Sequence, residues 1–405
     1  MSTDHLLDVR AISTTFGTPR GPVRAVEDVS FTLDRGHTLG IVGESGSGKS
    51  VLSRSIMGLV PNNATVTGSV RFDSFEMVGA SPRALRKVWG AQMAMVFQDP
   101  MTALNPVQKI GQQIIESIRE HLDYSGVQQR EAAVALLRSV GIPEPERRLS
   151  QYPHELSGGM RQRVVIAIAL ACGPALLFAD EPTTALDVTV QAQILDLLAA
   201  QQEERRMGVV LVTHDLGVVA TRADDIAVMY GGRIVEKAPT DVLFREMRHP
   251  YTEALLKSIP RLDLPSHTRL EAIGGRPPDL LHPPRGCRFA PRCPYARERC
   301  HEVEPPLEDA GDGHLYRCWY PVGIASEQTT LASVVEHAQE REPGDAVAAE
   351  PVLDTPADEA SGAATDPPST PPREVATGAG DGTTGDAAPA RDDPPPAPPA
   401  PEGTR

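Results

Sequence analysis

The stretch that most constrains the fold of this chain is residues 43–50, which read GESGSGKS and match the G-x-x-x-x-G-K-S pattern of a phosphate-binding loop. An apolar run at 39–42 precedes it and predicts a buried strand, and the residues after it predict a helix that ends at Gly58. In such a loop the glycines let backbone N–H groups point at an anion, Lys49 places a positive charge beside the β- and γ-phosphates, and Ser50 offers its hydroxyl to Mg²⁺. The motif therefore predicts an α/β domain that binds a nucleoside triphosphate.

The charge of the chain is concentrated at its C-terminal end. Of the net charge of −15, residues 340–405 carry −10, from 14 acidic and 4 basic residues, which leaves −5 for the 339 residues before them. A general nucleic-acid binder carries an excess of positive charge, and these 339 residues have no such excess. The segment 326–405 is rich in Pro, Ala, Gly, Asp and Thr, and its few hydrophobic side chains predict a disordered acidic tail.

No segment of the sequence is long and apolar enough to cross a bilayer. The longest uncharged apolar run, residues 164–172, is far shorter than the roughly 20 residues required. The N-terminal residues MSTDH also lack the basic and apolar regions of a secretion signal. We therefore expect the protein in the cytosol, and we expect any membrane role to work through a partner.

Polar residues follow three further apolar runs, as they would at the ends of buried strands. The pairs of strand and polar residue are 93–97 with Gln98, 175–179 with Asp180 and Glu181, and 209–213 with His214. Beside a phosphate-binding loop, a glutamine can reach the metal and the attacking water, one carboxylate can hold Mg²⁺, a second can polarise the water, and a histidine can contact the γ-phosphate. Each of these residues alone could equally be an ordinary turn, core or surface residue. The prediction therefore depends on their combination with the loop.

Three other patterns predict how this domain is organised. Alternating strands at 7–12 and 29–33 predict an antiparallel sheet ahead of the loop. Helical spacing of apolar residues at 107–149 predicts a helical insert. That insert leads into LSGGM at 156–160, where Ser157 and two glycines open another helix and form a second anion-binding concavity.

Taken together, these residues resemble the nucleotide-binding subunits of ABC transporters over roughly residues 6–320. The resemblance implies that Phe16 stacks on the nucleotide base and that residues 185–187 form the D-loop. It implies contacts to ATP for Phe16, Gly43, Glu44, Ser45, Gly46, Ser47, Gly48, Lys49, Ser50, Val51, Ser157, Gly158, Gly159 and Asp187. It also implies Mg²⁺ contacts for Ser50, Gln98 and Asp180, and catalytic roles for Glu181, His214 and Gln98.

The resemblance narrows to the D-type ATP-binding subunit of the oligopeptide and dipeptide importers. The segments that carry it are FQDPMTALNP at 97–106, HPYTEALLKSIP at 249–260, GGRPPDLL at 274–281 and CRFAPRCP at 287–294. It implies ATP hydrolysis that energises peptide import, on the cytoplasmic face of the cell membrane. The partners it implies are a second ATPase subunit that is a paralogue, two transmembrane permeases and an extracytoplasmic peptide-binding protein, with no nucleic acid among them.

In that family, the phosphate loop of one subunit and the signature sequence of a facing subunit enclose each ATP, so that hydrolysis lets the two subunits part.

Two alternatives to this function stay open. The chain could serve the same importer branch with nickel or another small solute as cargo, or it could drive a soluble ABC machine. Soluble members usually join two ATPase domains or insert long coiled coils, whereas this sequence has one set of motifs and no long heptad region.

Four of the five cysteines lie close together in the sequence, at Cys287, Cys293, Cys300 and Cys318. Four thiolates can hold either a [4Fe–4S] cluster or a tetrahedral Zn²⁺. The tight C-x₂₋₄-C pairs usual in zinc sites are absent, and the resemblance to peptide importer subunits also points to iron. We therefore expect a [4Fe–4S] cluster, with Zn²⁺ as the alternative. Six arginines between 276 and 299 could offset its negative charge, be solvated or contact an anionic lipid.

The predicted architecture has three parts. Residues 1–260 form an α/β nucleotide-binding domain with a RecA-like core, an antiparallel β subdomain and a helical insert at about 99–172. Residues 261–325 form a small cysteine-rich extension that holds the cluster, and 326–405 form the disordered tail.

Overall fold

The computed structural model describes residues 5–184, 186–258 and 273–323. All of them belong to the first of two compact units of the chain, residues 1–346, and the second unit is 347–405. The predicted acidic tail and the predicted domain boundaries at 260 and 325 lie outside the described residues.

The N-terminal part contains a four-stranded antiparallel sheet with the strand order β2-β1-β4-β5. Its strands are β1 (Leu7–Thr18), β2 (Gly21–Leu33), β4 (Ala64–Phe72) and β5 (Phe75–Glu76). Side chains such as Leu7, Val9 and Ile12 are buried in the core, as a strand with one covered face requires. Both β1 and β2 are longer than the predicted runs, because shifts of register between Val9 and Thr15 let the ladder continue where the alternation is interrupted.

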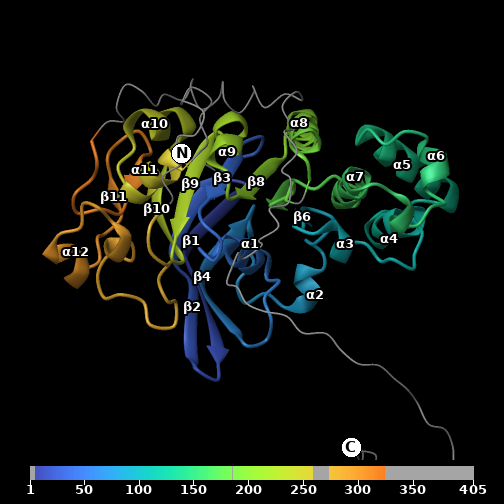
Figure 1. Ribbon diagram of the computed structural model, residues 1–405. Helices are drawn as coiled ribbons and strands as arrows, with labels where there is room; N and C mark the ends of the chain where they lie inside the picture. The colour runs from blue at the N-terminus through green and yellow to red at the C-terminus, as the bar shows by residue number, and fades with distance from the viewer. Residues whose placement is uncertain (1–4, 185, 259–272, 324–405) are drawn as a thin grey trace, which may run out of the picture. The chain divides into compact units, whose positions relative to one another are not determined.

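The second sheet has the order β11-β12-β10-β9-β3-β8-β7-β6. Five of its strands run parallel: β3 (Thr38–Val42), β6 (Met93–Val96), β7 (Leu176–Asp180), β8 (Gly208–Thr213) and β9 (Asp225–Tyr230). Almost every residue in them is buried, as expected for parallel strands covered on both faces. The helices α1 (Lys49–Met57), α8 (Val188–Arg205) and α9 (Leu216–Arg222) lie beside this sheet (Figure 1). The polar residues predicted from sequence follow β3, β6, β7 and β8, so they gather where these strands end.

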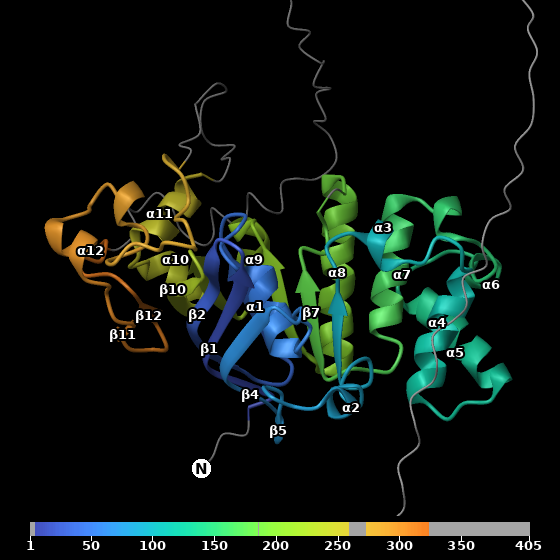
Figure 2. The ribbon, with the colours of Figure 1, turned by 90° about the horizontal axis from the view of Figure 1, so that it is seen from below.

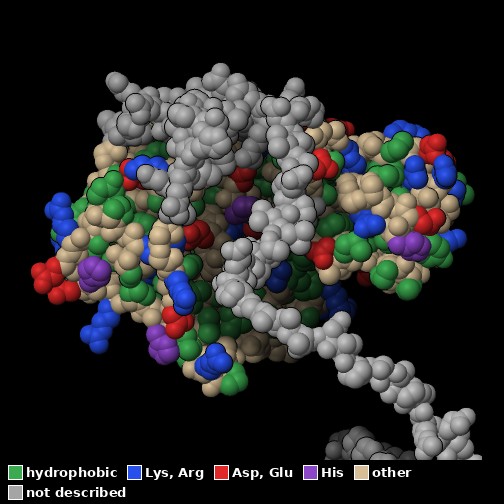
Figure 3. Space-filling model, in the orientation of Figure 1, with side chains coloured by type: hydrophobic (Ala, Val, Ile, Leu, Met, Phe, Trp, Pro, Cys, Tyr) green, Lys and Arg blue, Asp and Glu red, His purple; other side chains and the backbone are tan. Residues whose placement is uncertain are grey.

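A group of helices lies beyond the β6 edge of this sheet, as both ribbon views show (Figures 1 and 2). Its members are α3 (Pro100–Ala103), α4 (Ile110–His121), α5 (Gly126–Ser139), α6 (Pro145–Arg148) and α7 (Gly158–Ala169), while α2 (Pro82–Leu85) precedes β6. The helical pattern at 107–149 is divided into α4, α5 and α6, because Ser125 caps the start of α5 and Gly141, with a φ of +71°, ends it. Acidic and basic side chains are intermixed over these helices on the face in Figure 3.

The C-terminal extension joins the parallel sheet directly. Strand β10 (Arg233–Pro239) runs antiparallel to β9 and is followed by α10 (Thr240–Glu246) and α11 (Pro250–Lys257). The extension then supplies α12 (Glu298–Glu302), β11 (Glu308–Asp309) and β12 (Leu315–Tyr316). β12 pairs with β10, with Tyr316 opposite Glu236, so the extension widens the ATPase sheet at the edge opposite β6. Among the described helices, none has the length and apolar character needed to cross a bilayer.

Glu236 of β10 is a carboxylate buried at the junction between the core sheet and the extension. Its oxygens accept hydrogen bonds from the backbone N–H groups of Arg248 (2.5 Å) and His249 (3.0 Å) and from Nε2 of His314 (2.8 Å). Both Glu236 and His314 are almost completely buried. Because a buried carboxylate requires such partners, this residue fixes the α10–α11 loop and the β11–β12 hairpin at one place.

We expect replacement of Glu236 with Ala to lower the free energy of unfolding by about 3–5 kcal/mol, because three buried donors lose their acceptor. Urea denaturation of the full chain measures the change. Glu246→Ala is the matched control, since its carboxylate pairs with Arg245 and Arg248 near the surface and should cost less than about 1 kcal/mol. Equal losses in the two variants would contradict the assignment of Glu236 as a structural centre.

Candidate active site

The phosphate-binding loop lies between β3 and α1 and is pressed against the backbone of two other strands. A Cβ atom added at Gly43 would come within 2.1 Å of the carbonyl oxygen of Met229 in β9, and one at Gly48 within 2.5 Å of that of Ala25 in β2. No side chain fits at such distances, and Gly48 also has a φ of +104°, in the region that favours glycine. The motif glycines are therefore required by the packing of the loop as well as by the anion it binds.

Lys49 is buried at the start of α1, with its side chain folded back over the loop. Its Nζ donates hydrogen bonds to the carbonyl oxygens of Gly43 (2.7 Å) and Glu44 (3.0 Å). Burial lowers the pKa of Lys49, and the carboxylates of Glu181 and Asp180 nearby oppose that shift. The ammonium group is thus held inside the curl of the loop, where the motif predicts the phosphates to bind.

Ser50 and Asp180 form a pair that fits the predicted magnesium site. Oγ of Ser50 donates a hydrogen bond to Oδ1 of Asp180, at 2.8 Å, across the gap between α1 and the end of β7. Asp180 is buried, and this burial raises its pKa more than the bond from Ser50 lowers it. A hydroxyl and a carboxylate oxygen in contact provide the hard oxygen ligands that Mg²⁺ prefers.

The predicted catalytic residues meet at Glu181. Its Oε2 accepts hydrogen bonds from Nε2 of Gln98 (3.0 Å) and Oγ1 of Thr184 (2.9 Å), and Nδ1 of His214 lies 3.5 Å away. Glu181 has a φ of +47°, a conformation that residues other than glycine rarely adopt. Gln98, Glu181 and His214 come from the ends of three different strands, so the sheet itself brings them to one carboxylate oxygen.

One cavity of about 610 Å³ contains most of the predicted nucleotide contacts. The predicted residues that line it are Glu44, Ser45, Gly46, Gly48, Lys49, Ser50, Val51, Gln98, Glu181 and His214. Gly43 and Ser47 lie in the same loop but are not part of the lining. Ala25 of β2 and Leu280 of the extension also line the cavity, and neither residue was predicted from the sequence. Leu280 stands in a segment that carries the family resemblance, yet no local pattern assigns it a role.

The remaining predicted ATP contacts lie outside this lining. Phe16 is in β1, opposite Val23 of β2. Ser157 caps α7 by accepting a hydrogen bond from the backbone N–H of Met160 (3.3 Å), and both it and Gly158 are exposed, with Gly159 next to them partly so. Asp187 caps α8 in the same way, through the N–H of Val190 (2.9 Å). The signature residues and Asp187 are thus at or near the surface and away from the chain's own nucleotide cavity, and the predicted contact of Phe16 with the base stays a prediction.

The four clustered cysteines line a second, small cavity, together with aromatic and apolar side chains such as Phe289 and Trp319. The backbone N–H of Cys287 donates to the carbonyl oxygen of Cys300 (2.7 Å). Burial raises the pKa of Cys287 to about 11 and that of Cys318 to about 12. Among the described residues, no group of three or more His, Cys, Asp or Glu side chains is arranged to hold a metal ion. The four thiols therefore share one cavity without forming a ready-made metal site in the part of the chain that the structure describes.

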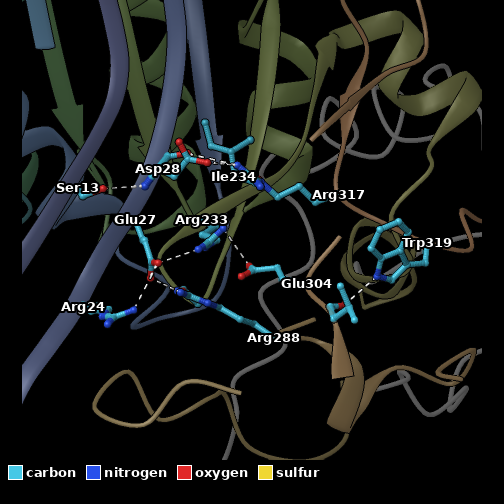
Figure 4. A network of polar contacts seen from close by, with 12 residues as sticks. Ser13, Arg24, Glu27, Asp28, Arg233, Ile234, Arg288, Glu304, Arg317 and Trp319 are labelled. Atoms are coloured by element: carbon cyan, nitrogen blue, oxygen red, sulfur yellow. Dashed lines mark hydrogen bonds and ion pairs between the residues drawn. The ribbon is translucent and has the colours of Figure 1, made fainter. Parts of the chain in front are cut away.

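Arginines next to the cysteines in sequence reach outward to acidic residues of the core. Arg288 follows Cys287 and pairs with Glu27 of β2, which also accepts from Arg233 (2.8 Å) (Figure 4). Arg317, which precedes Cys318, pairs with Asp28 (2.7 Å; Figure 4), and Arg292, which precedes Cys293, pairs with Glu44 (2.6 Å). Arg288 and Arg292 are almost completely buried in these ion pairs, so neither is solvated or available to an anionic lipid, which were two of the three roles expected from sequence. No local sequence pattern indicates these ion pairs, because the paired residues lie more than 200 positions apart.

Comparison with known proteins places these features in a family. The chain matches the family described as ABC transporter over residues 26–184, and the family described as Oligopeptide/dipeptide transporter, C-terminal region, over 235–300. It is 50% identical over 317 residues to the oligopeptide transport ATP-binding protein OppD of Bacillus subtilis (strain 168), which covers 78% of this chain and 88% of that protein. It is 48% identical over 318 residues to the dipeptide transport ATP-binding protein DppD of Haemophilus influenzae, covering 78% and 96%.

The fold is also similar to that of a solved ATPase. The dimeric post-hydrolysis state of the ATP-binding cassette MJ0796, bound to ADP and Pi, matches with a TM-score of 0.53 and 28% identity, over 58% of this chain and 98% of that one. The predicted α/β fold of an ABC ATPase is therefore confirmed. With half of its aligned residues identical to a transport ATP-binding protein, the chain is an ATPase that belongs to the oligopeptide/dipeptide transport ATP-binding proteins of the ABC transporter family.

Proposed function

We propose that this protein hydrolyses ATP to energise the import of di- or oligopeptides, bound to permeases at the cytoplasmic face of the cell membrane. The observation that carries the proposal is the cavity in which Glu181, held by Gln98, faces the loop that carries Lys49. This arrangement can activate a water molecule against a bound triphosphate. The peptide cargo follows from the relatives, which are oligopeptide and dipeptide transport proteins at 50% and 48% identity.

In the proposed reaction, binding and catalysis fall to different groups of this chain. The loop N–H groups and Lys49 hold the β- and γ-phosphates, and Ser50 and Asp180 hold Mg²⁺, which when bound neutralises phosphate charge. Glu181 accepts the proton of the attacking water while Gln98 keeps its carboxylate oriented. Because these residues are on separate strand ends, the site is set by the sheet and needs little rearrangement within one subunit.

We propose that a facing ATPase subunit, a paralogue of this one, completes each site with its signature residues. In this chain the signature residues 157–159 are at the surface or only partly covered and outside the chain's own cavity. A Cβ atom at Gly159 would lie 2.8 Å from Val190, so the signature packs closely on α8, next to Asp187. The two segments therefore present a joint surface to a partner. The similar cassette MJ0796 was solved as a dimer.

The proposed contact with the permeases lies beside Gln98. Three hydrophobic side chains here are unusually exposed for their size: Phe97 (40%), Met101 (59%) and Val107 (80%). Because the three lie within one short stretch of the chain, we take them as candidates for one binding surface. Because Phe97 precedes Gln98 directly, a permease helix bound here would move with the residue that orients Glu181.

Replacing Glu181 with Gln should leave ATP binding intact but lower the turnover of the assembled transporter at least about a hundredfold, because the amide cannot accept the proton of the attacking water. Phosphate release and ATP binding, measured on the same preparation, separate the two effects. Glu203→Gln, an exposed position on α8, is the matched control and should hydrolyse ATP normally. Near-normal turnover in Glu181→Gln would remove this residue as the base.

The partner set can be tested directly in membranes of the protein's own host. We expect gentle solubilisation of a tagged chain to recover two multi-span permeases, a second ATPase and an extracytoplasmic solute-binding protein, identified by mass spectrometry. Peptide binding by that recovered protein would then support the proposed cargo. Recovery of ribosomal or DNA-associated proteins alone, or of a binding protein that takes only nickel, would contradict the proposal.

We also propose that Cys287, Cys293, Cys300 and Cys318 hold a [4Fe–4S] cluster. Four thiols line their common cavity, and the other ionisable side chains in its lining are His249 and two tyrosines. Four thiols are a donor set suited to iron and sulfide. Cys287 and Cys293 precede α12, Cys300 lies within it and Cys318 follows it, so a cluster bound to all four would link three segments of the extension.

We expect anaerobically purified protein to contain close to four iron and four sulfide per chain, and Cys300→Ser to lose most of both. Iron and acid-labile sulfide analysis measures this, with Cys172→Ser as the control because Cys172 lies outside the cavity. Stoichiometric zinc without iron in the wild-type protein would establish the alternative metal.

A further inference from the structure

Arg292 of the extension contacts the phosphate-binding loop. Its two terminal nitrogens donate to the two carboxylate oxygens of Glu44, at 2.6 and 2.9 Å, and its side chain is 3% exposed. Such a bidentate pair is charge-assisted and fixes both groups in orientation. An arginine is charged at any pH that a folded protein experiences, so this contact is an ion pair. The extension thus holds one side chain of the ATP-binding motif.

The backbone of Glu44 is held as well. Its N–H donates to Oη of Tyr251 in α11 (2.8 Å), and its carbonyl oxygen accepts from Nζ of Lys49 (3.0 Å). Arg292 also donates to Oη of Tyr230 (3.2 Å), next to Tyr251. With its carboxylate, N–H and carbonyl all occupied, Glu44 has little freedom, and its carboxylate is neutralised beside the place where phosphates bind.

The same arginine holds the segment that brings Leu280 to the nucleotide cavity. Nε of Arg292 donates to the carbonyl oxygen of Gly274 (2.8 Å), and Nη2 donates to that of Ile273 (3.1 Å). Further along this segment, the carbonyl oxygen of Leu280 accepts from the N–H of Arg24 in β2 (3.2 Å). Leu280 then lies in the cavity lining with Ala25 and Val51, the other apolar residues there. The loop groups in this lining fit phosphates, which leaves the three apolar side chains as the contacts available to a nucleoside.

We propose that Arg292 is a positioning residue of the ATP site, which sets the phosphate-binding loop through Glu44 and seats Leu280 of the extension against the nucleoside. The extension is then part of the nucleotide site. The proposal concerns ATP binding alone and does not depend on the transported solute.

Another arginine offers a matched control, because it joins the extension to the core away from the loop. Arg317 donates to the carboxylate of Asp28 (2.7 Å) and to the carbonyl oxygen of Ile234 (3.2 Å). Neither Asp28 nor Ile234 lines the nucleotide cavity. If Arg292 only fastened the extension, removal of either arginine would have the same effect on nucleotide binding.

The test measures the Kd of ADP by isothermal titration calorimetry with the full chain, because ADP occupies the loop without being consumed. Arg292→Ala should weaken ADP binding about tenfold, the effect expected when a charge-assisted contact to the loop is lost. Arg292→Lys should recover only part of it, since an ammonium cannot form two parallel bonds. Arg317→Ala should change the Kd by less than about twofold, although both alanine variants lower the thermal stability of the nucleotide-free protein.

Glu44→Gln tests whether Arg292 acts through Glu44. Without Arg292, an unpaired Glu44 carboxylate repels the phosphates, so we expect Arg292→Ala to weaken binding less in the Glu44→Gln background than in the wild-type protein. Equal fold-changes in the two backgrounds would overturn the proposed route.

The proposed contact of Leu280 with the nucleoside has a matched control in the next residue, Leu281. Leu280→Ala should weaken ADP binding roughly fivefold through lost apolar contact, whereas Leu281, which packs near Gly21 and is outside the cavity lining, should tolerate the same change. This comparison remains decisive if Arg292→Ala does not fold. Equal Kd values for the two leucine variants would overturn the proposal, and so would equal Kd values for Arg292→Ala and the wild-type protein. Failure of the wild-type chain to bind ADP would instead contradict the ATPase assignment.

Discussion

Close contact between the backbone of the phosphate-binding loop and the strands beside it is the constraint on which the ATP site depends. The carbonyl oxygens of Met229 and Ala25 leave no room for a Cβ atom at Gly43 or Gly48. The N–H of Gly232, between β9 and β10, donates to the carbonyl oxygen of Ser47 (2.8 Å). The loop therefore contacts both the antiparallel and the parallel sheet, so its shape is set by both.

The extension is fastened to the same point. Arg288 donates to the carbonyl oxygen of Gly231 and to Glu27 of β2, and Arg292 holds Glu44 in the loop itself. Each of these arginines is next to a cysteine of the second cavity. A cysteine of the second cavity and the phosphate-binding loop are thus connected by one covalent step, from Cys293 to Arg292, and one ion pair, although Arg292 and Glu44 are 248 residues apart.

The parts of the fold and site that could be predicted from sequence each have a local pattern. The phosphate loop, and the polar residues Gln98, Asp180, Glu181 and His214 after apolar runs, could be found because a buried strand and its end are visible in a few adjacent residues. Leu280 and Arg292 could not, because their roles depend on contacts across the fold. The same holds for β12, whose two residues are too short a strand for any periodic pattern.

The pairing of β12 with β10 means that the catalytic core and the extension do not form separable modules. A chain cut between them would expose the edge of β10 and leave Glu236 without His314, Glu27 without Arg288 and Glu44 without Arg292. A hybrid subunit assembled from two relatives would have to exchange each arginine together with its acidic partner on the other side of the junction.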